Sequence, residues 1–154
     1  MNPIWRAAEQ FVTAGEVVAV DEFGNGNIND TYLVQTEGER ARRFVLQRIN
    51  TYVFRRPGLI IHNLRTCIDH VHQRNQAARE SASRRWEMPR LCTTRSGTYS
   101  YQDDDGSFWR AISYIDRSHT RETIRDQKHA GEVGYALGYF QQLLSDLDID
   151  QMHD

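Results

Sequence analysis

The sequence predicts an α+β fold in which a five-stranded antiparallel sheet carries a helix after its third strand. Three observations support this class. Short stretches rich in β-branched and aromatic residues alternate with turn signals over residues 16–49. A stripe of apolar residues at helical spacing follows Pro57-Gly58. Further strand patterns, joined by an Asp-Gly turn, come after that helix.

The first part of the chain is expected to form a helix and a three-stranded meander. Apolar residues recur at helical spacing over Ile4–Thr13, and Gly15 ends the helix. Strands are expected at Glu16–Phe23, Asp30–Thr36 and Arg43–Ile49. Alternation gives the third strand two faces. One face carries Phe44, Leu46 and Arg48, and the other carries Val45, Gln47 and Ile49.

A second helix is expected to begin at Pro57-Gly58, with an apolar stripe that ends at Val71. Residues 73–85 contain no large apolar side chain, so we expect a frayed helix end and a mobile loop there. Leu91–Thr94 is then expected to meet Thr98–Gln102 in a hairpin. The following Asp-Gly turn leads into the last strand, expected over Ser107–Ile115.

The end of the chain is expected to form a linker and a long helix. His119–Lys128 is polar and charged, which is typical of a linker or a short helix. The pattern of residues 130–147 predicts a helix, and three glycines on it would allow another helix to approach closely. Its inward face is expected to carry Val133, Leu137, Phe140 and Leu144.

Composition argues against several classes of partner. The net charge of -2 gives no reason to expect nucleic acid or an anionic membrane. No stretch approaches the roughly 18 apolar residues of a membrane span. The first residues show no apolar signal region, and Cys67 and Cys92 form no Cys-x-x-Cys pair. We therefore expect a cytoplasmic protein in a reducing compartment.

The most informative motif is EFGNGNINDTYLV, which spans residues 22–34. It predicts a strand, a Gly-x-Gly turn at Gly24–Gly26 and a second strand. Glycine lets the backbone N–H groups of such a turn approach a phosphate, because no Cβ is in the way. An ordinary hairpin whose glycines have positive φ explains the same spacing, so the spacing alone leaves both interpretations open.

Five sequence words together resemble the aminoglycoside/choline phosphotransferase family, in its subgroup of N-acetylhexosamine kinases and related sugar kinases. The words are GNGNINDTYLV (24–34), FVLQRINTYVF (44–54), NL (63–64), SGTYSYQDDDGSFWRAISYI (96–115) and GYALGYFQQLLSDLD (134–148). They span nearly the whole chain in the order of the family. The resemblance implies a protein-kinase-like N-terminal lobe over residues 1–116, with a hinge at 113–116. Residues 117–154 would then hold a linker and the first helix of a C-terminal lobe.

The resemblance also implies which residues contact the phosphates of ATP. The loop over the phosphates would comprise Gly24, Asn25, Gly26, Asn27, Ile28 and Asn29. Asn29 and Asp30 would orient this loop through side-chain bonds to the backbone. Arg48 stands where such kinases place the cation that contacts the α- and β-phosphates. Gln47 is the alternative, because a shift of one residue exchanges the two faces of a strand.

The adenine site implied by the resemblance lies at the hinge. Backbone groups of Ser113, Tyr114 and Ile115 would bond the edge of the base, although core packing also explains Tyr114 and Ile115. The adenine pocket would be lined by Val34, Val45 and Leu46, where core packing would also select apolar residues. Asp69 is the only carboxylate between Pro57 and Gln76, and we expect a solvated helix residue there rather than a partner of the phosphate-binding cation.

The catalytic residues of the family are absent from the sequence. Its chemistry needs a His-x-Asp-x-x-x-x-Asn loop and a later Asp, which together take the acceptor proton and hold Mg²⁺. No His-x-Asp occurs in the chain. Neither Asp146, Asp148 and Asp150 nor the group of Cys67, His70 and His72 has the spacing of a metal site. We therefore assign no catalytic and no metal-ligating residue.

Two functions follow as hypotheses. The first is the ATP-binding lobe of a small-molecule kinase, truncated before the lobe that would supply the Mg²⁺ ligands and the site for a sugar or amino-alcohol acceptor. The second is a non-catalytic nucleotide-binding or interaction module. It would use the apolar face of residues 130–147 to bind a second copy of the chain or a complementary catalytic lobe.

Overall fold

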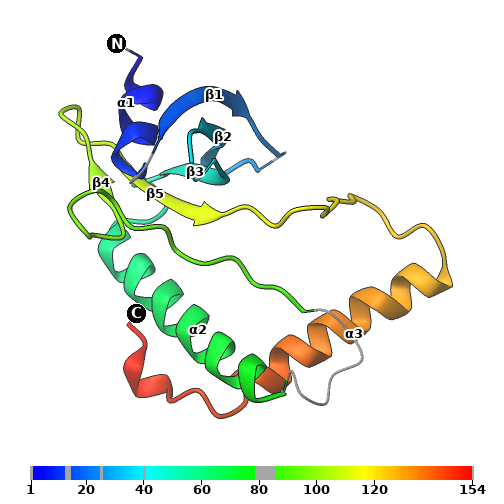
Figure 1. Ribbon diagram of the computed structural model, residues 1–154. Coiled ribbons are helices and arrows are strands. Elements are labelled where there is room, and N and C mark those ends of the chain that lie inside the picture. The colour runs from blue at the N-terminus through cyan, green and yellow to red at the C-terminus, as the bar shows by residue number, and fades with distance from the viewer. Residues whose placement is uncertain (1, 13–14, 25, 40, 79–85, 154) are drawn as a thin grey trace.

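The computed structural model describes residues 2–153 except 13–14, 25, 40 and 79–85. Helices and strands follow one another in an order close to that predicted (Figure 1). They are α1 (Pro3–Gln10), β1 (Glu16–Glu22), β2 (Asp30–Glu37), β3 (Arg43–Ile49), α2 (Pro57–Ala78), β4 (Tyr101–Gln102), β5 (Phe108–Ser113), α3 (Gln127–Leu144) and a 3₁₀ turn at Ile149–Gln151.

The strands form one five-stranded sheet in the order β1-β2-β3-β5-β4, and every neighbouring pair is antiparallel. The predicted α+β class and the antiparallel sheet are confirmed. Strand β3 lies at the centre, where Gln47 is paired with Thr31 of β2 and with Arg110 of β5. Residues that are partners across the strands share a face of the sheet. The register therefore decides which side chains can meet.

One face of the sheet packs against α1, and we call it the α1 face. The helix begins at Pro3 because Pro suits its first position and the side chain of Asn2 accepts a hydrogen bond from the Ile4 N–H at 2.9 Å. This face and α1 share a core in which Trp109 and Phe44 are the largest strand residues. The buried members are Ala7, Ala8, Phe11, Val12, Val34, Phe44, Leu46, Trp109 and Ala111.

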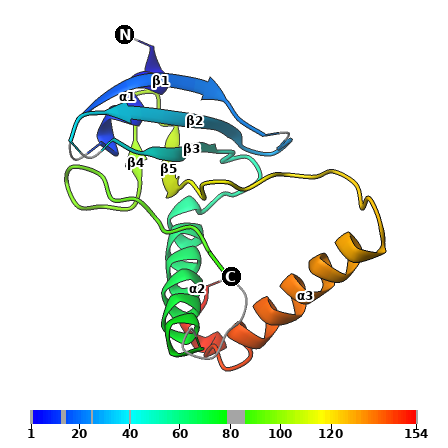
Figure 2. The same cartoon turned by 45° about the vertical axis from the view of Figure 1, so that its right-hand side comes forward.

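The other face of the sheet, which we call the inner face, carries Thr31, Leu33, Val45, Gln47, Arg110 and Ile112. Helix α2 leaves the sheet on this side, opposite α1 (Figure 2). The predicted division of β3 into two faces is confirmed by the core, since Phe44 and Leu46 pack with α1. Val45, Gln47 and Ile49 therefore point to the inner face.

Helix α2 is longer than its apolar stripe predicts. It continues to Ala78, so a frayed helix end is wrong for residues 73–78, whereas residues 79–85 of the expected loop lie outside the described residues. Polar contacts to the far part of the chain hold this last stretch in place. Arg74 pairs with Asp146, and the Tyr139 hydroxyl donates to Oδ1 of Asn75 at 3.2 Å. These contacts replace the apolar packing that the sequence lacks.

The hairpin expected between Leu91–Thr94 and Thr98–Gln102 is confirmed at its turn but does not continue as a regular ladder. Leu91 makes a single bridge to Ile112 of β5, and β4 is confined to Tyr101–Gln102. At the turn, the Thr94 N–H donates to the Thr98 carbonyl at 2.7 Å, and the Thr94 hydroxyl oxygen accepts from the Thr98 N–H at 3.1 Å. Such side-chain bonds to the backbone compete with a regular ladder.

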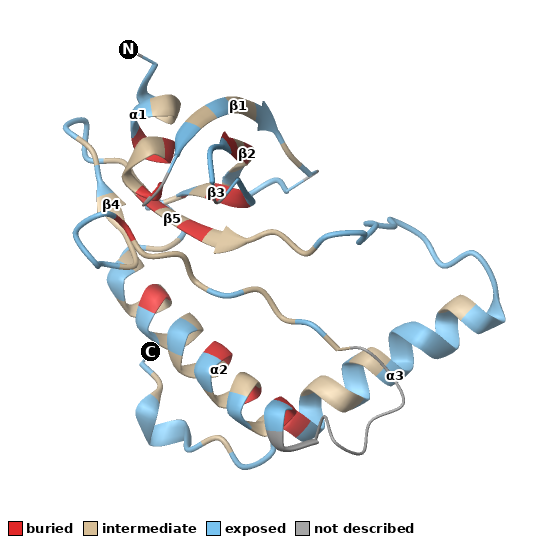
Figure 3. Ribbon diagram, in the orientation of Figure 1, coloured by how far each residue is buried: buried red, intermediate tan, exposed pale blue. Residues whose placement is uncertain are grey.

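Helix α3 begins at Gln127, three residues before the predicted start, because the side chain of Asp126 accepts from the His129 N–H at 2.7 Å. Its predicted inward face is wrong at Val133 and Leu137, which are 47% and 58% exposed. Only the C-terminal part of α3 approaches α2 (Figure 3), and there Leu143 is 3% exposed. Among the described residues, no helix combines the length and the apolar character needed to cross a bilayer.

Candidate nucleotide site

The turn between β1 and β2 closes where the Phe23 N–H donates to the Thr31 carbonyl at 2.9 Å. Gly24 has a φ of 80°, a conformation that favours glycine, so the turn itself explains this residue. Gly26 does not have positive φ, and a Cβ built on it would meet only the Asn29 carbonyl oxygen, at 3.9 Å. The fold therefore gives no reason for glycine at position 26.

A cavity of about 180 Å³ lies against this turn, lined by Glu22, Phe23, Gly24, Gly26, Asn29, Asp30, Thr31 and Tyr32. Of the predicted loop residues, Gly24, Gly26 and Asn29 line it. Asn27 and Ile28 are exposed on the turn, and Asn25 lies outside the described residues. A second, larger cavity of about 360 Å³ separates Gly24 from the linker at residues 120–125, which contributes Arg121 and Arg125.

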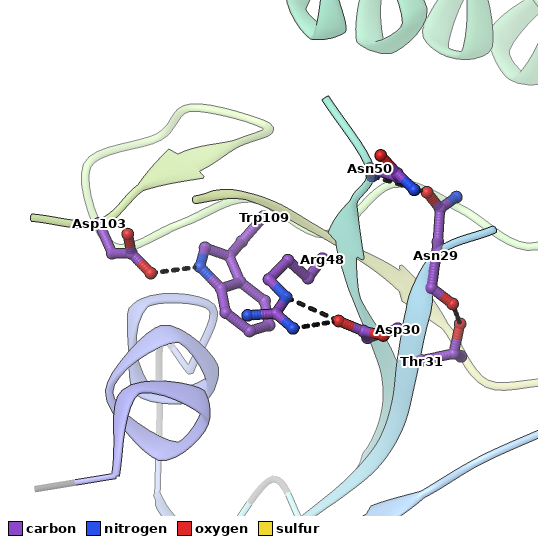
Figure 4. A network of polar contacts seen from close by, with 7 residues as sticks. All are labelled: Asn29, Asp30, Thr31, Arg48, Asn50, Asp103 and Trp109. Atoms are coloured by element: carbon purple, nitrogen blue, oxygen red, sulfur yellow. Dashed lines mark hydrogen bonds and ion pairs between the residues drawn. The ribbon is translucent and has the colours of Figure 1, made fainter. Parts of the chain in front are cut away.

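Asn29 holds the base of the turn (Figure 4). Its Oδ1 accepts from the backbone N–H of Asn50 at 2.9 Å, and the Asn50 side chain in turn accepts from the Tyr52 N–H at 3.0 Å. The predicted side-chain bond from Asn29 to the backbone is confirmed. The corresponding prediction for Asp30 is wrong, because its carboxylate accepts from the Arg48 guanidinium instead.

Arg48 lies on the α1 face. Its Nε donates to Oδ2 of Asp30 at 2.7 Å, and its guanidinium lies 5.8 Å from the centre of the Trp109 ring (Figure 4). The side chain is 47% exposed and borders a cavity of about 270 Å³ with Asp30, Asn50 and Ser107. Gln47, the alternative to Arg48, points to the inner face. The two candidates for the phosphate contact therefore lie on opposite sides of the sheet.

Sequence reasoning missed a cation on the inner face, Arg110 of β5. Its Nε donates to Oε1 of Gln47 at 2.9 Å, and burial lowers the pKa of its guanidinium. The sequence contains a signal for this residue. In WRAIS, side chains alternate between the two faces of the strand, so Arg110 points to the face opposite that of the buried Trp109. The pairing with Gln47, in contrast, depends on the register between β3 and β5 and needs the structure.

At the predicted hinge, the backbone of Ser113 is already paired. Its N–H donates to the Arg90 carbonyl at 2.8 Å, so it is not free for the edge of a base. The Ile115 carbonyl accepts from the Ser118 hydroxyl at 2.7 Å. A cavity of about 200 Å³ lies beside these residues and Tyr114, between the last turns of α2 and residues 86–90.

The Tyr114 ring connects the hinge to the glycine turn. It packs edge-to-face on Phe23 with centroids 5.9 Å apart, and the Arg43 guanidinium lies 4.5 Å from its centre. Of the residues expected to line an adenine pocket, Val34 and Leu46 are fully buried in the core beneath α1. Val45 alone lies on the inner face. Val34 and Leu46 therefore pack against α1 on the other side of the sheet from Val45.

The carboxylates of the helices pair within the chain. Asp69 lies 3.5 Å from the Arg65 Nε on the same helix and is 58% exposed, as expected for a solvated residue. His70, which the sequence grouped with Cys67 and His72, shares Asp146 with Arg74. Among the described residues, no three His, Cys, Asp or Glu side chains come together as a metal site. The described residues do not fit a Mg²⁺ ion, and we assign no ligand to it.

No known family model matches the chain. The geometry offers a glycine turn over a small polar cavity and a cation on the inner face. It also brings the Tyr114 ring into contact with Phe23 at the start of the turn. Such a site can bind and position a phosphorylated ligand.

Proposed function

We propose that this chain is the nucleotide-binding lobe of an ATP-dependent small-molecule phosphotransferase. The α+β order, the antiparallel sheet and the helix after β3 support the proposal, and so does the ordered set of sequence words shared with small-molecule kinases. In the whole protein, the γ-phosphoryl group of ATP–Mg²⁺ would pass to the hydroxyl of a sugar or amino alcohol. The Mg²⁺ ligands, the catalytic carboxylate and the acceptor site belong to residues outside this chain.

Gly26 is the observation that carries the proposal. An ordinary hairpin explains Gly24 through its positive φ, but it does not explain a second glycine with ordinary φ and open space around it. A phosphate loop explains both, because any side chain at Gly26 would stand between the ligand and the backbone N–H groups. Lobes of this kind contribute to catalysis by positioning the phosphates and stabilising their charge.

Titration calorimetry with ATP–Mg²⁺ tests the proposal. We expect weak, saturable binding in the millimolar range or tighter, which is lost in Gly26→Val. Gly131→Val is the matched control, because Gly131 also lacks positive φ and has no neighbour within 4 Å of an added Cβ. It lies on α3, away from the turn. If the wild-type chain binds no ATP at several millimolar, or if both variants bind equally well, the proposal fails.

A second function is favoured by the exposed side of α3. Val133 and Leu137, which lie four residues apart on one face of the helix, are 47% and 58% exposed. We propose as the alternative a non-catalytic module that binds a second copy of the chain, or a complementary catalytic lobe, through this side. Light scattering separates the two, because a self-associating module has a concentration-dependent mass that Leu137→Glu abolishes.

A further inference from the structure

Four residues on the inner face form a continuous chain of hydrogen bonds across three strands. Arg110 Nε donates to Oε1 of Gln47 at 2.9 Å, and Gln47 Nε2 donates to Oγ1 of Thr31 at 3.3 Å. The Thr31 hydroxyl then donates to the Asn29 carbonyl at 3.3 Å. Every group donates in the same direction, from β5 to the glycine turn. Bonds that run in one direction polarise and strengthen one another.

This chain fixes the orientation of Arg110 with respect to the turn. Gln47 can accept from Arg110 and donate to Thr31 only with its amide turned one way, so both neighbours hold it in place. Thr31 and Asn29 also line the cavity of about 180 Å³ against the turn. Arg110 is therefore connected through two side chains to the wall of the candidate phosphate site, although it lies on β5, on the other side of β3 from the turn.

Within the described part of the chain, no carboxylate pairs with the guanidinium of Arg110. Among the described residues, none of the ion pairs includes it, and its one side-chain bond uses only Nε. The residue is half-buried, and burial lowers the pKa of the guanidinium because the charge is poorly solvated. A buried charge without a partner is costly, and an anion that binds beside it offsets this cost.

We propose that Arg110, held by Gln47, is the cation that contacts the phosphates of the bound nucleotide. The inference rests on the proposed function. The two terminal nitrogens that the protein leaves without a charged partner match the bidentate geometry in which Arg binds phosphate. Gln47, which lies on the inner face between Arg110 and Thr31, acts as a positioning residue for the arginine of the neighbouring strand.

The test compares ATP–Mg²⁺ with adenosine on the whole chain by titration calorimetry. Wild type and Gly26→Val are measured first, so that a failure of the proposed function is recognised separately. We expect Arg110→Met to weaken ATP binding about ten- to one-hundred-fold, the range of one charged hydrogen-bonding contact, and to leave adenosine binding unchanged. Arg110→Lys keeps the positive charge but loses the planar guanidinium with its two terminal nitrogens, so its ATP affinity should lie between those of the wild type and Arg110→Met.

Arg6→Met is the control for the loss of one positive charge, because Arg6 lies on α1 and pairs with the exposed Asp104. Arg48→Met tests the rival assignment, in which Arg48 contacts the phosphates. If Arg48→Met weakens ATP binding and Arg110→Met does not, Arg48 is the phosphate contact and the proposal is overturned. If Arg110→Met weakens ATP and adenosine alike, Arg110 maintains the shape of the pocket and the proposal is again overturned. If the wild type binds no ATP, the inference falls with the proposed function.

Discussion

Arg48 and Asp30 tie the end of β3 to the first residue of β2, with Nε of Arg48 2.7 Å from Oδ2 of Asp30. Both side chains are about half exposed, at 47% and 51%. Water and salt screen such a pair, so its contribution to stability is small although its geometry is good. The pair occupies the Asp30 carboxylate on the α1 face, and this is why Asp30 does not bond to the backbone of the turn as the sequence predicts.

We predict that a double-mutant cycle of Asp30→Ala and Arg48→Ala gives a coupling energy of about 0.2–1 kcal/mol. Urea unfolding of the four proteins measures it. The coupling should fall further when the experiment is repeated at about 1 M salt, because screening then acts over about 3 Å. A coupling above about 2 kcal/mol would mean that the pair is shielded from water in solution.

Gly15 lies close to the backbone of Gly38 at the open end of the first hairpin, and this contact gives a prediction about stability. Gly15 has a φ of 85°, and an added Cβ would lie 2.0 Å from the backbone oxygen of Glu37. We predict that Gly15→Ala lowers the free energy of unfolding by about 3 kcal/mol or more, since backbone strain and a steric clash add. Thermal and urea unfolding measure the change.

Gly97 is the matched control for Gly15. It has nearly the same φ, 82°, but an added Cβ there has no neighbour within 4 Å. Gly97→Ala should therefore cost only the strain of the left-handed conformation, about 1–2 kcal/mol. Equal effects of the two substitutions would show that the backbone at Gly15 shifts to accept the side chain.

The sequence predicted local structure best where one periodicity dominates. The bounds of β3 and its two faces were correct, because alternation over Arg43–Ile49 is not interrupted by a turn signal. Helix α2 was misjudged at its end, and the hairpin after it was predicted correctly only at its turn. Arg74 of α2 pairs with the distant Asp146, and Leu91 makes its bridge to Ile112 of β5. Such contacts are not visible in a local pattern.

Only the part of the candidate site that lies in one local segment could be predicted from the sequence. Gly24, Gly26 and Asn29 follow one another in the chain, so a motif finds them. Arg110 and Gln47 meet only because β5 returns beside β3 with one particular register. The sequence singled out Arg48, and the pairing of strands brought a different arginine to the inner face.

Trp109 and Asp103 give a prediction about the β4–β5 turn. Trp109 is 1% exposed, and its indole N–H donates to Oδ2 of Asp103 at 2.8 Å, while Oδ1 accepts from the Ser107 N–H at 2.8 Å. Trp109→Phe should cost about 1–3 kcal/mol, because a carboxylate oxygen loses its donor. Trp109→Ala should cost about 3–5 kcal/mol. Urea unfolding measures both.

Two leucines on α3 form a matched pair. Leu143 is 3% exposed and Leu137 is 58% exposed, although they lie less than two turns apart on the same helix. Leu143→Ala should lower the free energy of unfolding by about 2–5 kcal/mol, whereas Leu137→Ala should change it by less than about 0.5 kcal/mol. Circular dichroism during urea unfolding follows the change. A large effect at Leu137 would show that its side chain is covered in solution, as the interaction module requires.

Asp146 makes the contact between α2 and α3 sensitive to acid. Its carboxylate lies 3.0 Å from Nε2 of His70 and pairs with Arg74. Desolvation raises its pKa, but the hydrogen bond to His70 and the charge of Arg74 outweigh that effect and hold the pKa below its ordinary value. A carboxyl whose pKa is lower in the folded state stabilises that state above the unfolded pKa, about 3.9 for Asp.

This stabilisation is lost as the pH falls through the lower folded pKa. We therefore predict that the α2–α3 contact holds at neutral pH and loosens only below about pH 4. The Trp86 ring reports on it, because it packs on Tyr139 of α3 with centroids 5.1 Å apart. In two-dimensional NMR, the indole N–H signal of Trp86 should shift over this acid range in the wild type and stay constant in Asp146→Asn. The same acid response in the variant would assign it to another carboxylate.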